Sequence, residues 1–297
     1  MKYLTFTLCA FLALTLSARE NFSRYAPPEA QAAVYLDLAA MRDLPAVQAT
    51  IDDPNAESTF LLNLLSLLSS HYAGFAIEDV EHVEFLALPG ARSVIVLSGD
   101  TLTKRNIDAR LEHLSGIERA TLPGSELAFL YTDATTQQQT AGALVEGGQL
   151  LVGGPASVRE LLARFQAKTE HPRAGQLAEL REGRPLAAAQ LLSLSAAEAG
   201  MFGGMLDDAL LTVTKGDDWL VRLRLTPTQT RDLDSITLLS QSALLLLRNH
   251  LEARGDASLA NALVDTLFIG REGGSVLLES RLSTELIVQA VEGRTPR

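Results

Sequence analysis

The chain has 297 residues, of which 47% are hydrophobic and 21% are charged. So many apolar side chains exclude disorder for most of the chain and are enough for one large domain or two of ordinary size. With 25 lysines and arginines against 36 aspartates and glutamates, the net charge is −11, which argues against nucleic acid or anionic lipid as a partner. Aromatic residues make up only 5%, with a single tryptophan, so stacking platforms for bases or sugars are scarce.

The N-terminus has the three regions of a secretory signal peptide. Lys2 supplies a positive charge, residues 4–16 form an apolar run, and Ser17-Ala18 offers small residues for cleavage. We expect residues 1–18 to be removed and the protein to be exported, to the periplasm or outside the cell. The apolar run is shorter than the roughly 20 residues that span a bilayer. No membrane span is therefore expected after cleavage; the alternative is an uncleaved N-terminal anchor.

The only cysteine, Cys9, lies inside this apolar run. Thr7-Leu8 precedes it, and it is too close to the start to be a lipoprotein cleavage point, so we reject lipidation. A mature chain without cysteine has no disulfide, no thiolate metal site and no cysteine nucleophile.

Strand and helix patterns alternate along the first half of the chain. The expected strands lie at 33–38, 80–88, 93–98, 117–122, 127–131, 140–146 and 149–153, and the expected helices at 56–70, 101–114 and 157–167. A polar stretch follows, with Pro172, Gly175 and Gly183, and we predict a linker at 171–184.

The second half repeats this pattern. Its expected strands lie at 185–192, 210–214, 219–225, 266–271 and 275–282, with a long helix at 228–254, a shorter one from 257 and a last one from Ser283. Adding 126 to Gly90 gives Gly216, and adding it to Gly147-Gly148 gives Gly273-Gly274. We therefore predict two divergent repeats of strand-helix-hairpin-helix-hairpin-helix, one over residues 19–170 and one over 185–297.

The predicted fold class is α+β, with antiparallel sheet carrying helices on one face. The alternation in 219–225 supports this, because Leu223 and Leu225 share one side of the strand while Arg222 and Arg224 point to the other. The pattern leaves open whether the repeats form one sheet or two.

The histidines form no metal or catalytic motif. The five are His71, His82, His113, His171 and His250, and none belongs to HExxH or to a pair at i, i+4. We interpret each as a hydrogen-bonded or exposed histidine. There is also no G-x-S-x-G, P-loop or G-x-G-x-x-G motif. We predict no catalytic, cofactor-binding or metal-binding residue, no cofactor and no enzymatic activity.

Other polar patterns suit structural roles. Gly153-Gly154-Pro155 lies between a strand and a helix, where amides can bind an anion, but Pro155 lacks an amide and turn geometry explains the glycines. The acidic pairs Asp52-Asp53, Asp207-Asp208 and Asp217-Asp218 lack the spacing of a calcium loop, and we interpret them as turns and helix caps.

A pair of charges at i, i+3 occurs near a helix start in each half. Arg105 precedes Asp108, and Arg231 precedes Asp234. We expect a surface salt bridge within each pair. The alternative is a pseudo-symmetric polar site between the repeats.

Two helices are apolar around most of their circumference, at 60–68 and at 244–247. Such a helix is buried on both sides, bound to a partner, or part of the lining of an apolar cavity. We expect burial between the sheet and another helix.

The start of the mature chain resembles a group of exported bacterial proteins of unknown function. The shared features are the turn at Pro27-Pro28, the strand 34–38 ending in Asp-Leu, and a short helix to Met41. The resemblance implies an exported protein and supplies no catalytic residue.

We expect a non-enzymatic protein with a binding or assembly role at the cell envelope, whose partner is an unknown envelope protein. The alternative is a periplasmic carrier or chaperone of apolar ligands, lipid or lipoprotein. A third candidate, a hydrolase, would need His113 or His250 beside a buried acid and a serine.

Overall fold

The computed structural model describes residues 21–44, 79–90, 92–113, 116–133, 135–192, 200–253 and 257–285. The predicted signal peptide, Cys9 and the predicted helix at 56–70 lie outside these residues. Within them, no helix combines the length and the apolar character that crossing a membrane requires.

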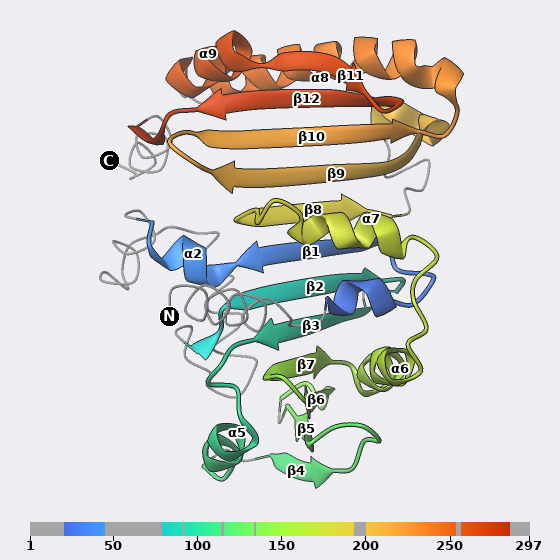
Figure 1. The fold of residues 1–297 in the computed structure, drawn as a ribbon, viewed down its shortest axis with the longest axis vertical. Helices are drawn as coiled ribbons and strands as arrows, with labels where there is room; N and C mark the ends of the chain where they lie inside the picture. Colours follow the sequence, from blue (N-terminus) through green and yellow to red (C-terminus); the bar gives the residue numbers. More distant parts are fainter. Residues whose placement is uncertain are drawn as a thin grey trace, which may run out of the picture.

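Twelve strands in the described residues form a single antiparallel sheet (Figure 1). They are β1 (Ala32–Asp37), β2 (His82–Leu88), β3 (Arg92–Ser98), β4 (Ile117–Ala120), β5 (Leu127–Thr132), β6 (Gln139–Val145), β7 (Gln149–Gly153), β8 (Ala187–Leu191), β9 (Leu206–Lys215), β10 (Trp219–Pro227), β11 (Phe268–Glu272) and β12 (Ser275–Leu282). Their order is β11-β12-β10-β9-β8-β1-β2-β3-β7-β6-β5-β4. The predicted antiparallel sheet is confirmed, and both halves of the chain contribute to it.

The strand order runs the same way outward from the centre in both halves. From β1 it is β1-β2-β3-β7-β6, and from β8 it is β8-β9-β10-β12-β11. Gly90 lies in the turn between the second and third strands of the first series, and Gly216 lies in the same turn of the second series. Gly147-Gly148 and Gly273-Gly274 turn the outer hairpins, and all four have positive φ angles, which glycine adopts without strain.

The two series meet where β1 pairs with β8, and two buried alanines lie on one face of this junction. Five residue pairs join the strands in antiparallel register. On one face Ala33 and Ala188 are buried in the same apolar cluster as Leu180. Leu180 belongs to the 3-10 helix η3 (Glu179–Arg181), which contacts both strands. Since alanine side chains are short, the helix can lie close to the sheet at this point.

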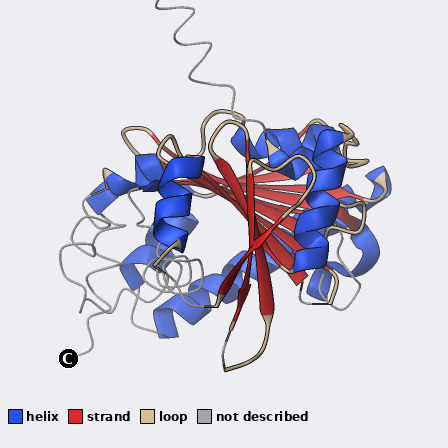
Figure 2. Cartoon of the chain, turned by 90° about the horizontal axis from the view of Figure 1, so that it is seen from below, coloured by secondary structure: helices blue, strands red, loops and turns tan. Residues whose placement is uncertain are grey.

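Helical elements cover both faces of the sheet (Figure 2). Those on the face of Ala188 are η1 (Phe22–Tyr25), α6 (Pro155–Gln166), α7 (Ala174–Ala178) and η3. Those on the opposite face are α2 (Leu38–Arg42) and α5 (Lys104–Leu111) over the first half and α8 (Leu233–Ala253) over the second. The remaining helical elements are η4 (Gly200–Met205), η5 (Thr230–Asp232) and α9 (Ala257–Thr266).

The prediction of helices on one face only is therefore wrong, and β3 shows the physical reason. Val94 and Val96 belong to the apolar cluster on one face, whereas Ile95 and Leu97 belong to the cluster on the other. A strand that is apolar on both sides must be covered on both sides.

The strand β10 alternates as predicted. Leu223 and Leu225 pack in a cluster with Ile236 of α8. Arg222 and Arg224 lie on the other face, where they pair with Glu279 of β12 at 2.7 Å and with Glu179 of η3 at 2.5 Å. On this face of β10 the two arginines are therefore held by ion pairs to a neighbouring strand and to η3.

The segment predicted as a linker, residues 171–184, contains α7 and η3. Leu177 and Leu180 of these helices are buried in the central apolar cluster. The connection between the halves thus contributes to the core of the protein.

We expect that a larger side chain at the junction destabilises the protein on one face of β8 and not on the other. Replacing Ala188 with Leu forces a larger side chain under η3 and is expected to lower the free energy of unfolding by about 2 kcal/mol. Ala189→Leu, on the opposite and less buried face of the same strand, is the control and should change it by less than about 0.5 kcal/mol. Urea denaturation measures both, and equal effects would contradict close packing of η3 on the junction.

Candidate functional site

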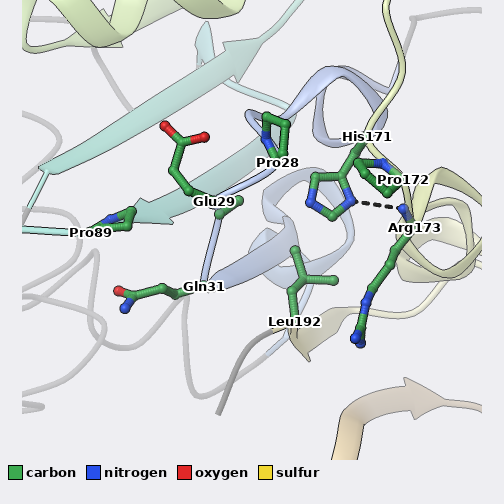
Figure 3. Close-up of a pocket in the computed structure, with 9 residues that line it drawn as sticks. Pro28, Glu29, Gln31, Pro89, His171, Pro172, Arg173 and Leu192 are labelled. Atoms are coloured by element: carbon green, nitrogen blue, oxygen red, sulfur yellow. Dashed lines mark hydrogen bonds between the residues drawn. The ribbon is translucent and has the colours of Figure 1, made fainter. Parts of the chain in front are cut away.

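A surface hollow of about 430 Å³ lies beside the start of β1. Its polar lining comes from Glu29 and Gln31 before β1 and from His171 and Arg173 before α7 (Figure 3). Pro28, Pro89, Pro172, Ala30 and Leu192 complete the lining. The hollow therefore carries one acidic and one basic side chain among short apolar walls.

His171 is held as a neutral side chain at the edge of this hollow. Its Nδ1 accepts a hydrogen bond from the backbone N–H of Arg173 at 3.0 Å, so the ring proton is on Nε2. Burial lowers the pKa of His171, although the backbone carbonyl of Pro28 acts in the opposite direction. The backbone N–H of His171 donates to the carbonyl of Arg24 at 2.6 Å. The residue thus joins the start of α7 to the end of η1.

A buried carboxylate, Glu84 of β2, connects three elements on the same face of the sheet. Glu84 is 1% exposed. Its Oε2 accepts hydrogen bonds from the backbone N–H of Ser23 at 2.7 Å and from the Ser23 hydroxyl at 2.5 Å. Its Oε1 accepts from the guanidinium of Arg181 in an ion pair. Glu84 thereby ties η1 and η3 to the sheet.

Next to this pair, His82 forms a polar group with two residues of β1. The Tyr35 hydroxyl lies 3.0 Å from His82 Nδ1, and the two rings stack with centroids 5.8 Å apart. Asp37 Oδ1 lies 3.7 Å from the same nitrogen. Burial, with the charge of Asp37 as second cause, raises the pKa of Tyr35 to about 12. The phenol therefore stays protonated at neutral pH, as a hydrogen-bonding rather than a basic group.

A second buried carboxylate, Asp208 of β9, lies on the same face of the sheet in the other half. It accepts hydrogen bonds from Gln190 of β8 at 3.2 Å, from Thr226 at 3.0 Å and from Gln176 at 2.8 Å. Burial raises the pKa of Asp208, and the Thr226 hydrogen bond partly opposes this. Gln190 with Asp208 has the same diagonal relation across β8 and β9 as Tyr35 with His82 across β1 and β2.

The predicted charge pairs are made with other partners. Asp108 of α5 pairs with Arg119 of β4, and Asp234 of α8 pairs with Arg271 of β11. The predicted Arg105–Asp108 and Arg231–Asp234 bridges are therefore wrong, because each aspartate faces a neighbouring strand. The two sites also lie at opposite ends of the sheet, so they do not form one polar site (Figure 1).

The other polar residues considered in the sequence analysis do not come together in one site. His113 is exposed just after α5, Gly154 caps α6, and Asp217-Asp218 is exposed in the β9–β10 turn. His71, Asp52-Asp53 and the side chain of His250 lie outside the described residues. Asp207 pairs with Arg173 at 2.7 Å, whereas the buried Asp208 accepts hydrogen bonds from uncharged side chains. No group of three His, Cys, Asp or Glu side chains able to hold a metal ion occurs in the described part of the chain.

Among the described side chains of helix α8, three large apolar ones are exposed to solvent. Leu238, Leu245 and Leu246 are 64%, 58% and 59% exposed, and we name them the α8 leucine stripe. Ile236 and Ser240, on the opposite side of the helix, are buried. The expectation that 244–247 is buried between the sheet and another helix is thus wrong for Leu245 and Leu246, because the sheet contacts only one side of α8.

Comparison with known proteins finds no match. No family model fits the chain, and no curated protein or solved structure is similar to it.

The Glu84 ion pair predicts a large effect of a small substitution. Glu84→Gln removes the charge opposite Arg181 and is expected to lower the free energy of unfolding by about 3 kcal/mol. Glu279→Gln, which affects the more exposed pair with Arg222, is the matched control and should cost less than about 1 kcal/mol. If denaturant titrations gave Glu84→Gln a cost as small as that of the control, Glu84 would not anchor η1 and η3.

His171 predicts a loss of stability in acid. Because its pKa is lowered in the folded state, the unfolded chain binds the proton more readily. The contribution of neutral His171 is complete above pH 6.5, the ordinary value, and is lost as the pH falls below it. His171→Gln should therefore unfold with a flatter dependence on pH below 6.5, whereas exposed His113→Gln should follow the wild type. Thermal unfolding at several pH values tests this, and parallel curves for wild type and His171→Gln would refute it.

Proposed function

We propose that this chain is an exported, non-enzymatic protein that acts through binding or assembly at the cell envelope, with the α8 leucine stripe as its binding surface. The exposure of Leu238, Leu245 and Leu246 carries this proposal. Single exposed leucines are common on protein surfaces, but three on one side of one helix form an apolar patch of the kind that marks protein interfaces. Glu84, Asp208 and His171 each form hydrogen bonds or an ion pair to other parts of the chain, which supports a structural role for these groups.

The proposal includes descent of the two halves from one duplicated unit. Three observations support it: the matching strand order, the matching turn glycines, and the equivalent diagonal pairs at Tyr35–His82 and Gln190–Asp208. The second unit differs by its longer helix after the third strand, since α8 occupies the place of α5. The elongated helix is the element that carries the leucine stripe.

The alternative function, a carrier of apolar ligands, would use the same leucines to hold a lipid or lipoprotein. The described hollow is less suited to an acyl chain, because Glu29, Gln31 and Arg173 line it. Native mass spectrometry of the purified full chain separates the two functions. A carrier would retain copurified lipid, whereas a protein-binding module would not.

Crosslinking in the producing cell tests the stripe. The tagged full chain should give protein adducts, and Leu238→Gln with Leu245→Gln should reduce them at least about tenfold, because each leucine buried at an interface contributes more than a kcal/mol. Phe268→Gln is the matched control, since Phe268 is 61% exposed but lies on β11. Equal adducts from all three proteins would contradict the proposal.

A further inference from the structure

Two leucines of the α8 leucine stripe are placed symmetrically about a point near the middle of the helix. Leu238 and Leu245 lie seven residues apart, with Gln241 and Ser242 at the midpoint. Seven residues are almost two helical turns, so both leucines lie on one side. All four side chains are exposed.

We propose that the α8 leucine stripe binds the same stripe of a second copy of this chain, with the two α8 helices antiparallel and a two-fold axis between Gln241 and Ser242. This inference rests on the proposed function and names the partner. In a two-fold interface, if residue i contacts residue j, then j contacts i. Leu238 of each copy then lies opposite Leu245 of the other, and the four leucines are removed from water together.

The charges that flank the leucines fit the same register. Arg248 falls opposite Ser235, next to Asp234, which is 82% exposed at its side chain. Glu252 falls opposite Arg231 of η5, which is also exposed. Within one chain Arg248 pairs with Glu252, and Asp234 pairs with Arg271. At each end of the helix pair, the ion pairs of the two copies therefore meet with opposite charges facing each other.

A parallel arrangement lacks this complementarity. It would also bring leucines together, but it would place Arg248 opposite Arg248 and Asp234 opposite Asp234. Like charges at an interface are unfavourable and select against that orientation. The charge pattern thus favours an antiparallel pair over a parallel one, and a second copy over an uncharged apolar ligand, which has no charges to face those beside the leucines.

Disulfide crosslinking tests the register directly. In a full chain carrying Cys9→Ser, the Leu238→Cys and Leu245→Cys proteins are prepared with tags of different size and mixed under mild oxidation. The proposal predicts a covalent dimer between the two different proteins, because only this pair brings the sulfurs within bonding reach. Dominant self-crosslinking of Leu238→Cys would show a parallel pair and overturn the proposal. Gln229→Cys, before η5, is the control, and it should form far less covalent dimer when it is mixed with Leu245→Cys under the same conditions.

Sedimentation of the protein without introduced cysteines measures the dimer itself. We expect twice the monomer mass at micromolar concentration and a dissociation constant raised at least about 100-fold by Leu238→Gln with Leu245→Gln, but not by Phe268→Gln. Circular dichroism of the double variant verifies that it is folded. A monomer at all concentrations would overturn the homodimer. If the protein is a monomer but the crosslinking in cells still gives adducts that depend on the leucine stripe, the proposed function stands and only the homodimer is wrong. If there are no such adducts either, the proposed function and the homodimer are both wrong.

Discussion

The pairing of β1 with β8 is the constraint on which the rest of the structure depends. Without it, β1 and β8 would each present an unpaired strand edge beside the buried Ala33 and Ala188. With it, twelve strands form one sheet, and the helices α7 and η3 can bridge both halves from above. On that face of the junction Ala33 lies opposite Gln190 and Ala188 lies opposite Tyr35. A larger side chain at either alanine would hold the bridging helix away from the sheet.

The polar groups of the molecule follow from this arrangement. Glu84 and Asp208 are buried beside the junction, one in each half, and each is surrounded by donors: Ser23 and Arg181 for the first, and Gln176, Gln190 and Thr226 for the second. Buried carboxylates with full hydrogen bonding fix the position of the chain segments that supply the donors. The elements held in this way, η1, α7 and η3, are the ones that cover the junction. The buried carboxylates therefore fix the helical elements that close the apolar core over the junction.

Local signals in the sequence predicted the strands and their turns well. Gly147-Gly148 and Gly273-Gly274 mark hairpins because the required φ angles are positive, and the alternation in β10 correctly separated Arg222 from Leu223. What sequence alone could not predict depends on contacts between distant segments. The meeting of Tyr35 with His82 needs the strand register, and that of Ser23 with Glu84 needs the position of η1 on β2. The cover on both faces needs the position of α5 relative to α6. The exposure of Leu245 and Leu246 could not be predicted, because a run of leucines indicates an apolar helix but does not show which of its sides the rest of the chain covers.

The central claim is that both halves form one cooperative body through the β1–β8 ladder. Native-state hydrogen exchange measures this directly, because amides of one cooperative unit open together with the same free energy. The amides that β1 and β8 share are predicted to exchange as slowly as those of β2 and β9 and to respond to denaturant with the same slope. Fast exchange confined to β1 and β8, with the two halves protected to different extents, would show two separate units and contradict this account of the fold.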